Sequence, residues 1–402
     1  MADNFNKLSM KGFLDNLKGR SARLAAGSPT PPPATDTSRE IARALHPGVQ
    51  YATVSSVADL PDGAKAYELV PDKIRGTEAF AFAPAGKYLT VFAEINGMTV
   101  TRPYSIASSP ADSCGNKYMI AIKPVEGGLV SNYIIDTWKE GTAVKISDPT
   151  GNFDYQPLRD AHKVIGIAGG SGITPFLSFA NAIADGDEDF ELTLLYGSRN
   201  EKAELFREEL DALAEKTEKF RIVHVYSDDD VPESDGYEKG FVTADLIKKY
   251  APEGEPYSLF ICGPQAMYNF VDEEIKKLDL PRKYVRHELF GEPHNASSLR
   301  NYPEGDFPAT VCITVHIQDK TYSVTGNIND TIMQSIEKSG IAVPARCRSG
   351  ECGFCHSIVL AGKYWIPENL DFRRLADEPF GGVHPCVTFP LSDIEIDVPA
   401  AK

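Results

Sequence analysis

The sequence of 402 residues lacks a long uninterrupted apolar run and lacks an excess of positive charge. Its only long uncharged stretch, residues 164–184, contains Gly169-Gly170-Ser171-Gly172 and Pro175, so it predicts a strand, a turn and a helix rather than a membrane span. No signal peptide is expected. The formal net charge is −16, from 41 Lys and Arg against 57 Asp and Glu, which argues against a nucleic-acid-binding protein. A chain of this length with 42% hydrophobic residues has room for two or three globular domains.

Cysteine is also scarce, with seven residues in the chain. Three of them, Cys114, Cys262 and Cys312, are scattered and suggest no disulfide framework. This pattern favours a reducing compartment, so we expect a cytoplasmic location.

The other four cysteines form the most informative pattern in the chain. Cys347, Cys352 and Cys355 have the spacing C-x4-C-x2-C, and Cys386 follows 31 positions later. This is the plant-type ligand pattern of a [2Fe–2S] cluster, in which two bridged irons take four thiolates. Two glycines in the loop would let backbone N–H groups approach the cluster sulfurs. Structural zinc is the alternative, but zinc sites usually pair two C-x2-C units, and only one is present here.

Residues 48–158 predict an antiparallel β-barrel, because short β-rich runs alternate with Gly and Pro. The runs cover residues 51–57, 66–70, 88–94 and 118–123. Within this region, Arg102-Pro103-Tyr104-Ser105 could present an arginine to a phosphate, an aromatic ring to a flat heterocycle and a hydroxyl to its edge. Taken alone, the segment could equally be an ordinary strand. The glycines of Gly127-Gly128-Leu129-Val130-Ser131-Asn132 precede a helical stretch at 133–138, and free N–H groups at a helix start suit a pyrophosphate.

These segments, with the turn at 148–153, resemble the flavin domain of the ferredoxin–NADP reductase superfamily. The resemblance implies that Arg102 and Ser131 bind phosphate, that Tyr104 stacks on the isoalloxazine ring and that Ser105 approaches the N5 edge of the ring. The residues expected to contact the flavin are Arg102, Pro103, Tyr104, Ser105, Ile122, Gly128, Leu129, Val130 and Ser131. The expected flavin is FAD, with FMN as the alternative because Pro124 replaces a residue that is often basic in flavin-pyrophosphate sites.

Residues 159–290 alternate between strand-like and helix-like segments, which predicts an α/β domain with a parallel sheet. A buried strand at 164–168 runs into the glycine-rich turn, but Pro175 occupies the third glycine position of the Rossmann pattern. Strands at 192–196 and 258–261 lead into two further loops, Gly197-Ser198-Arg199 and Cys262-Gly263-Pro264-Gln265-Ala266-Met267. Ligands of such domains lie beyond the carboxyl ends of the strands, so the three loops are expected to form one site.

The three loops resemble the nicotinamide domain of the same superfamily. The expected NAD(P)-binding residues are Gly169, Gly170, Gly172, Thr174, Pro175, Ser198, Arg199, Cys262, Gly263, Pro264 and Met267. Tyr104, Ser105 and Cys262 are expected beside the reacting atoms, although Cys262 could also be a small buried filler. His287 and Glu288, in a segment that resembles the end of this domain, are not expected to be catalytic. An acidic residue directly after strand 192–196 would hold a ribose 2′-hydroxyl, and none is present there. The coenzyme therefore remains NADH or NADPH, with NADH favoured.

The C-terminal part, residues 308–402, has the order of a plant-type ferredoxin domain with the β-grasp fold. Strands are expected at 310–317, 321–324 and 391–398, with a helix through Lys338 that Asn329 or Asp330 could cap. Residues 291–307 predict an exposed linker. Residues 1–47 form an extension with a proline-rich spacer at 28–33, interpreted either as loosely packed chain or as a docking element.

The order of the three domains predicts a route for electrons. A nicotinamide gives up two electrons together and a [2Fe–2S] cluster takes one, whereas a flavin can accept a pair and release single electrons. We therefore expect an oxidoreductase that passes electrons from NAD(P)H through the flavin and the cluster to a separate acceptor protein. The domain order is similar to that of the reductase components of Rieske-type and diiron oxygenases and of the NADH reductase of hybrid cluster protein.

Three hypotheses about the final step remain open on the sequence alone, and the first is transfer of electrons to a separate protein that docks near the cluster. Arg346, Arg348, His356 and Lys363 surround the cluster loop and could form a basic rim that docks an acidic acceptor, or could simply be solvated charges. The second hypothesis is a self-sufficient reductase of a ferric chelate, a quinone or a corrinoid. The third, a redox-sensing regulator, would not oxidise NAD(P)H.

Overall fold

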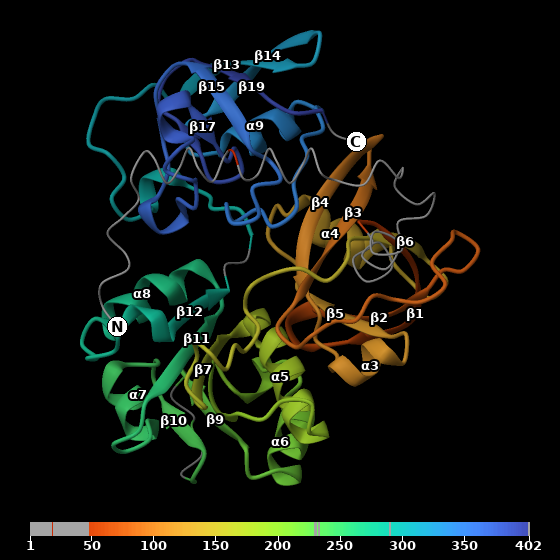
Figure 1. The fold of residues 1–402 in the computed structure, drawn as a ribbon, viewed down its shortest axis with the longest axis vertical. Coiled ribbons are helices and arrows are strands. Elements are labelled where there is room, and N and C mark those ends of the chain that lie inside the picture. Colours follow the sequence, from red (N-terminus) through yellow and green to blue (C-terminus); the bar gives the residue numbers. More distant parts are fainter. Residues whose placement is uncertain (1–17, 19–47, 229–230, 232–233, 289–290, 401–402) are drawn as a thin grey trace. The chain divides into compact units, whose positions relative to one another are not determined.

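The fold is described from a computed structural model (Figure 1), which describes Lys18 and residues 48–228, 231, 234–288 and 291–400. The chain divides into two compact units, Met1–Ala44 and Leu45–Lys402, and the strands described below all belong to the second. The proline-rich spacer and the docking role considered for residues 1–47 lie outside the described residues, which in this range include only Lys18.

The first part of the larger unit is an antiparallel half-barrel. Its strands are β1 (Gln50–Asp59), β2 (Lys65–Pro71), β3 (Tyr88–Ile95), β4 (Met98–Ser105), β5 (Tyr118–Ile122) and β6 (Ala143–Ile146), in the order β4-β3-β6-β1-β2-β5. Every pairing in this sheet is antiparallel. Its other elements are η1 (Pro61–Gly63), α3 (Pro110–Cys114) and α4 (Leu129–Thr137). Alternating residues of the strands, such as Ala52, Val54, Leu89 and Val91, fill the barrel core.

The second part is a six-stranded parallel sheet in the order β10-β9-β8-β7-β11-β12. Its strands are β7 (Lys163–Gly169), β8 (Glu191–Ser198), β9 (Phe220–Tyr226), β10 (Tyr237–Lys239), β11 (Tyr257–Cys262) and β12 (Val285–Glu288). The helices are η2 (Gly170–Ile173), α5 (Thr174–Asp185), η3 (Glu201–Ala203), α6 (Arg207–Lys216), α7 (Ala244–Tyr250), α8 (Gln265–Ile275) and η4 (Arg282–Tyr284). Separate apolar cores pack α5 and α6 on one face and α7 and α8 on the other, so the sheet is covered on both faces.

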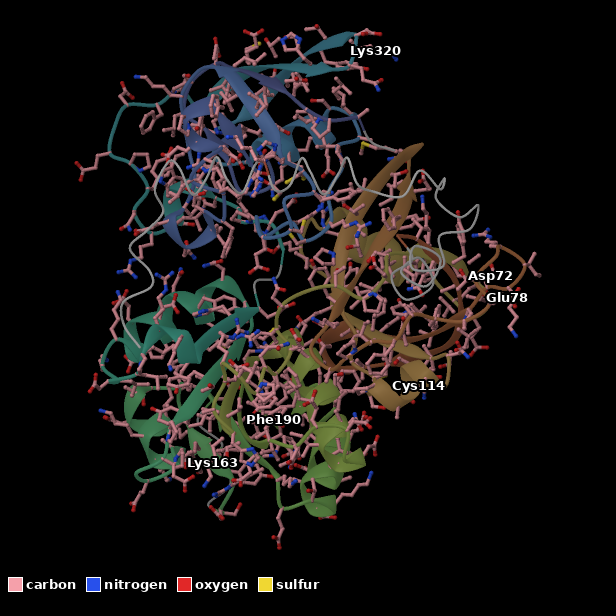
Figure 2. The ribbon with its side chains drawn as sticks, in the orientation of Figure 1. Asp72, Glu78, Cys114, Lys163, Phe190 and Lys320 are labelled. Atoms are coloured by element: carbon pink, nitrogen blue, oxygen red, sulfur yellow. The ribbon has the colours of Figure 1, made fainter. Side chains whose placement is uncertain are left out.

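The barrel and the parallel sheet share an aromatic core. Phe153, which follows the barrel strands, packs against Phe176 of α5 and Phe260 of β11, with ring centroids 5.8 and 5.2 Å apart. Phe190, labelled in Figure 2, belongs to the same core. Arg286 of β12 adds polar contacts, since its Nη1 lies 2.6 Å from the Asp160 carboxylate and 2.9 Å from the Asp154 carbonyl oxygen.

The C-terminal part is a mixed sheet with its own core. The main sheet has the order β14-β13-β19-β15-β17, in which β13 and β19 are parallel and the other pairs are antiparallel. The strands are β13 (Thr310–Ile317), β14 (Lys320–Asn327), β15 (Ser357–Ala361), β16 (Tyr364–Trp365), β17 (Gly382–Val383), β18 (Phe389–Pro390) and β19 (Ile394–Asp397), with β16 and β18 forming a separate pair. The helices are η5 (Ala296–Ser298), α9 (Ile332–Lys338), η6 (Glu368–Leu370) and η7 (Glu378–Phe380). This arrangement of a helix on a mixed sheet agrees with the predicted ferredoxin fold.

Three local expectations need correction. Helix α4 begins at Leu129, four positions before the predicted start, so Ser131 lies within its first turn. Helix α9 is capped by Thr331, whose side chain accepts from the backbone N–H of Gln334, and neither Asn329 nor Asp330 is the cap. The segment 291–307 is not exposed throughout, because the Glu292 side chain is only 3% exposed.

No helix among the described residues combines the length and the apolar character needed to cross a bilayer.

Candidate functional site

Strand β4 places the Arg102-Pro103-Tyr104-Ser105 segment at one edge of the barrel sheet, paired with β3. Tyr104 lies opposite Leu89, and Ser105 lies opposite Tyr88. Because side chains alternate along a strand, Arg102 and Tyr104 share one face and are partly exposed, whereas Ser105 lies on the other face and is buried. A flat ligand could therefore contact the Tyr104 ring while Ser105 forms part of the wall at the strand end.

The Ser105 hydroxyl provides a direct test of whether a flavin fits here. Its Oγ is buried and has no hydrogen-bond partner. Most buried polar atoms in proteins are paired, so an unpaired hydroxyl beside a half-buried aromatic ring is consistent with a ligand that supplies the partner. The Thr150 hydroxyl, joined to the same region by the Tyr88–Thr150 backbone hydrogen bonds of 2.8 and 2.9 Å, is unpaired as well.

A cavity of about 550 Å³ lies beside this strand end. It is lined by Phe82, Pro84, Lys87, Asp148, Pro149, Thr150, Gly151 and Asp154. Its volume is in the range of ligand pockets, and about half of its lining comes from the 148–153 turn. The turn singled out in the sequence therefore forms part of a cavity near Ser105.

The glycines before α4 form the start of a nine-residue helix, as an anion site would require. Gly128 is the N-cap residue, and a side chain there would approach the Ser131 Oγ to 2.6 Å. No side chain caps this helix start, so its first N–H groups are available to a ligand. Arg102, the other residue expected to bind phosphate, lies 3.4 Å from the Glu292 carboxylate. Burial lowers the pKa of Arg102, and the neighbouring Arg348 lowers it further.

The glycine-rich turn and the Cys262 loop meet where the strand order of the parallel sheet reverses. The chain proceeds from β7 outward to β8, β9 and β10, then returns to place β11 on the other side of β7. At Gly172, a Cβ atom would lie 2.2 Å from the Cys262 carbonyl oxygen, so only glycine permits this close approach. Open α/β sheets bind dinucleotides at such a switch point. The structure thus brings together the loops after β7 and β11, two of the three loops expected to form the site.

Cys262 is fully buried at the end of β11, and Glu288 lies directly opposite it on β12. Burial raises the pKa of the Glu288 carboxyl well above its usual range, and the Glu351 carboxylate adds to this effect. Burial likewise raises the pKa of the Cys262 thiol. Both groups lie at the carboxyl end of the parallel sheet, beside the expected nicotinamide position. No local sequence signal distinguishes Glu288, because its burial depends on the neighbouring strand and on the cluster loop.

Ser198 and Arg199 lie at the end of β8, but Arg199 already has a partner. Its Nη2 lies 3.0 Å from both carboxylate oxygens of Asp62 in η1. Asp62 also accepts from Lys123 Nζ at 2.8 Å. Asn200, the next residue, donates from Nδ2 to the Asp228 carboxylate at 2.7 Å. Two carboxylates thus lie around the position where a ribose 2′-phosphate would need free cations.

The four cysteines of the C-terminal domain lie in two pairs. The Sγ atoms of Cys355 and Cys386 are 3.5 Å apart, and the Cys347 Sγ accepts from the Cys352 backbone N–H at 3.4 Å. Interaction with the Cys352 side chain, together with backbone N–H donors, lowers the pKa of Cys347. Two irons with two thiolates each require such pairs.

Arg348 is not part of an exposed basic rim. Its side chain is 0% exposed and forms ion pairs with Glu292 and Glu337. Arg346 is partly exposed, with its guanidinium 4.6 Å from the centre of the Phe354 ring and 3.5 Å from the Asp148 carboxylate. Arg348 is therefore not part of the predicted basic rim, because buried carboxylates neutralise the charge of its guanidinium.

Comparison with known families agrees with this geometry along the whole larger unit. Residues 76–155 match the Oxidoreductase FAD-binding domain, residues 167–273 the Oxidoreductase NAD-binding domain, and residues 315–391 the 2Fe-2S iron-sulfur cluster binding domain. The chain is 30% identical over 350 residues to the ferredoxin reductase component of 3-ketosteroid-9-alpha-monooxygenase from Rhodococcus rhodochrous, covering 85% of this chain and 94% of that relative. The chain belongs to this family of iron–sulfur flavoprotein reductases.

Two further comparisons cover most of the reductase. It is 27% identical over 327 residues to the glycine betaine monooxygenase reductase from Pseudomonas aeruginosa, covering 79% of this chain and 87% of that relative. The solved structure of phthalate dioxygenase reductase is similar with a TM-score of 0.61 and 25% identity, covering 88% of this chain and 98% of that one. The fold class, the oxidoreductase activity and the presence of FAD-binding, NAD-binding and [2Fe–2S] domains predicted from the sequence are confirmed.

Proposed function

We propose that this reductase delivers electrons from NADH, through its flavin and its cluster, to a separate oxygenase component. The relatives named above are components of oxygenase systems by their names, which supports an acceptor of that class. The observation that carries the proposal is the exposure of the cluster loop, in which Cys352 is the exposed member of the four cysteines. An exposed ligand gives an outside protein a short path to the cluster.

The residues of the proposed flavin site have distinct roles. The bound flavin supplies the chemistry that joins two-electron and one-electron transfer. Tyr104 offers its ring as a stacking surface, and Ser105 offers its unpaired hydroxyl to the ring edge. Arg102 and the α4 start at Gly128–Ser131 hold the phosphate groups. Pro103 and Ile122 shape the wall, together with Leu129 and Val130.

The proposed nicotinamide site is formed by the loops after β7, β8 and β11. Gly169, Gly170 and Gly172 let the chain pass beneath the dinucleotide, with Thr174 and Pro175 at the start of α5. Gly263, Pro264 and Met267 line the opposite side, and Met267 lies where a side chain on Gly263 would clash with it. Cys262 contacts the nicotinamide from the end of β11, where its side chain is fully buried.

NADH is the proposed coenzyme. The Arg199 guanidinium is already paired with Asp62, and Asp228 lies beside the next residue along the chain. A 2′-phosphate would have to displace one carboxylate and approach another, whereas a 2′-hydroxyl could use the same oxygens as acceptors. Anaerobic titration with each coenzyme, followed by the loss of flavin absorbance, tests this choice; equal affinity for NADPH would contradict it.

The proposed docking surface is the aromatic rim, defined as Phe354, Phe372, Leu375 and Phe380. All four side chains are exposed, from 45% at Phe372 to 87% at Leu375, on the segment around the cluster loop. Phe354 lies within the cluster loop and Phe372 lines the same pocket as Cys352, and exposed apolar side chains beside a redox centre mark an interaction surface. Arg346, His356 and Lys363 remain as the polar edge of this rim after the loss of Arg348.

The deciding experiment compares acceptors. Purified reductase should oxidise NADH faster when an oxygenase component that lacks its own reductase is added, and the oxygenase metal centre should become reduced. Turnover with ferric chelates or quinones that exceeds turnover with every candidate protein would instead support a self-sufficient small-molecule reductase.

All seven cysteines are free, which supports the proposed location in a reducing compartment, the cytoplasm.

A further inference from the structure

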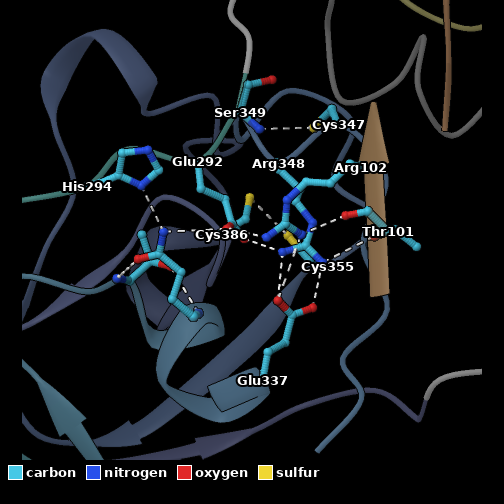
Figure 3. A network of polar contacts seen from close by, with 12 residues as sticks. Thr101, Arg102, Glu292, His294, Glu337, Cys347, Arg348, Ser349, Cys355 and Cys386 are labelled. Atoms are coloured by element: carbon cyan, nitrogen blue, oxygen red, sulfur yellow. Dashed lines mark hydrogen bonds and ion pairs between the residues drawn. The ribbon is translucent and has the colours of Figure 1, made fainter. Parts of the chain in front are cut away.

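A buried cluster of charges surrounds Arg348, the residue that directly follows the cluster ligand Cys347. The Arg348 Nη1 donates to Glu292 and, at 2.8 Å, to Glu337 of α9. The side chains of Arg348, Glu292 and Glu337 are 0%, 3% and 7% exposed. Figure 3 shows the guanidinium between the two carboxylates.

The same cluster reaches strand β4 of the flavin domain. The Arg348 Nη2 donates to the Thr101 hydroxyl at 3.3 Å. The Arg102 Nη2 lies 3.4 Å from the Glu292 carboxylate, and its Nη1 lies 4.0 Å from Glu337. Two arginines and two glutamates therefore share one buried site, and their formal charges cancel.

Glu292 occupies a special place in this arrangement, since it belongs to neither the barrel nor the C-terminal sheet. It lies four residues after the end of β12, in the segment that leads to β13. One carboxylate contacts both arginines: Oε1 accepts from Arg348 and Oε2 faces Arg102. Gln334 of α9 donates a further hydrogen bond to Glu292 Oε2 at 3.4 Å.

Removing the charge of Glu292 would leave the buried Arg348 and the partly exposed Arg102 with one carboxylate. A buried charge without its partner is strongly unfavourable, so the two arginines would move apart or admit water. Either change shifts Arg348, and with it the adjacent Cys347, relative to β4. The distance between flavin and cluster would then change, because Thr101 and Arg102 lie on the strand that continues to Tyr104 and Ser105.

We infer that Glu292 is a positioning residue for the transfer of electrons from the flavin to the cluster. Its carboxylate holds the cluster loop against the flavin strand by neutralising Arg348 and Arg102 at once. Glu292 itself carries no electron and contacts no reacting atom. The inference rests on the proposed route from flavin to cluster, and its test uses the two steps of that route separately.

The test is anaerobic stopped-flow reduction of the loaded reductase by NADH, with the flavin and cluster absorbances followed as separate phases. Glu292→Gln keeps the size of the side chain and removes its charge. We expect flavin reduction to stay within about twofold of wild type and cluster reduction to slow by about tenfold, as small displacements of reacting groups can do. The matched control is Glu304→Gln, an exposed glutamate in the same connecting segment, which should leave both phases unchanged.

Further readouts separate positioning from a merely structural role. Iron and sulfide content and the electron paramagnetic resonance spectrum of the reduced cluster should be those of wild type in Glu292→Gln. If this variant does not retain its cluster, Thr101→Val decides, since it removes only the acceptor on β4; we expect cluster reduction to slow by about threefold, the value of one hydrogen bond.

An unchanged cluster phase in loaded Glu292→Gln would overturn the inference, as would an equal slowing of both phases. Loss of the cluster from Thr101→Val as well would mean that the charges serve only folding, which also overturns it. Failure of the proposed route is recognisable in the wild type itself, where the flavin would bleach with NADH and the cluster would stay oxidised.

Discussion

At the scale of single residues, the clearest functional signals are polar or nucleophilic atoms that the protein leaves without partners. The Ser105 Oγ is buried and unpaired on the strand that carries Tyr104. An unpaired buried hydroxyl costs about 1–3 kcal/mol, which a ligand that completes the hydrogen bond would recover. In the proposed flavin site, completing the hydrogen bond to Ser105 would contribute part of the free energy of flavin binding.

The substitution Ser105→Ala tests this role. We expect NADH-dependent reduction of the flavin to slow by about five- to tenfold, because roughly one hydrogen bond to the ring edge is lost. The flavin-free protein should be as stable as wild type or slightly more stable, since the variant removes an unsatisfied group. Stopped-flow rates and thermal unfolding with and without flavin measure both effects. Ser55→Ala, at an exposed serine, is the control; a marked loss of stability in the flavin-free Ser105→Ala protein would contradict this account.

A second residue-scale prediction concerns the paired cysteines. Cys386→Ser removes one thiolate from the Cys355–Cys386 pair, so we expect loss of most of the cluster, while flavin reduction by NADH continues. Cys312→Ser is the matched control, because the exposed Cys312 contacts only Ser323 among the interactions described for its side chain. Iron and sulfide analysis measures the outcome. Zinc in place of iron and sulfide in wild type prepared without air would refute the cluster assignment.

The sequence indicated these cysteines but could not indicate the partners of Arg348. Four thiolates with plant-type spacing are recognisable because the chemistry requires that spacing. Arg348 looked like a surface charge, since its neighbours in sequence are small and polar. Its burial depends on Glu292 and Glu337, which lie 56 and 11 positions away. Long-range pairing of this kind leaves no local periodicity from which it could be predicted.

At the scale of helices and strands, the strands were predicted well and the helix starts less well. β7, β8 and β11 lie within one or two residues of the predicted segments, because buried parallel strands are short apolar runs bounded by glycine. The start of α4 was misplaced because Leu129 and Val130 do not distinguish a loop from a first turn. The cap of α9 was recognisable in principle, since Thr331 and Gln334 have capping-box spacing.

One element-scale prediction concerns the buried histidine of β9. The His224 Nδ1 lies 2.9 Å from Glu204, and its Nε2 lies 3.0 Å from Asp211 of α6. Burial alone would lower the pKa of His224, but hydrogen bonds and charges from Glu204 and Asp211 raise it above its usual value. Because the pKa of His224 is raised in the folded state, the contacts of His224 with Glu204 and Asp211 stabilise the protein fully below about pH 6.5, the unfolded pKa. This stabilisation is lost as the pH rises through the folded pKa.

We therefore expect the difference in unfolding free energy between wild type and His224→Gln to shrink between pH 6 and pH 9. The expected change is on the order of 1 kcal/mol for each unit of pKa shift. Denaturant unfolding at several pH values measures it. A His224→Gln difference that is constant with pH would contradict the assignment.

At the scale of the whole molecule, the order of the domains follows from the chemistry that each one performs. The barrel and the parallel sheet share the Phe153 core, which packs the domains of the proposed flavin and nicotinamide sites against each other. The C-terminal domain has its own core and meets the flavin strand through buried charges. In the proposed route, apolar packing positions the groups of the first electron-transfer step, and ion pairs position those of the second. The sequence predicted the three domains from their motifs, but not this difference between their contacts.

We propose that the final step takes place at the exposed side of the C-terminal domain, and the composition of that side predicts how an acceptor binds. Arg348 is buried and paired, whereas the aromatic rim supplies exposed apolar side chains in the segment around the cluster loop. Apolar contacts are little affected by salt, whereas pairs of exposed charges are screened. We expect the rate of transfer to an acceptor protein to depend only weakly on ionic strength and strongly on the rim aromatics.

Phe380→Ala is the variant that separates these contributions. Large aromatic side chains at the centre of an interface dominate binding, so we expect the KM for the acceptor protein to rise by about tenfold. NADH-dependent reduction of ferricyanide, which needs no protein interface, should be unchanged. The matched control is Phe241→Ala on the NAD-binding domain, where the side chain is 66% exposed but distant in sequence from the cluster loop. Equal effects of the two substitutions, or a steep fall of the wild-type rate with salt, would place the acceptor elsewhere on the reductase.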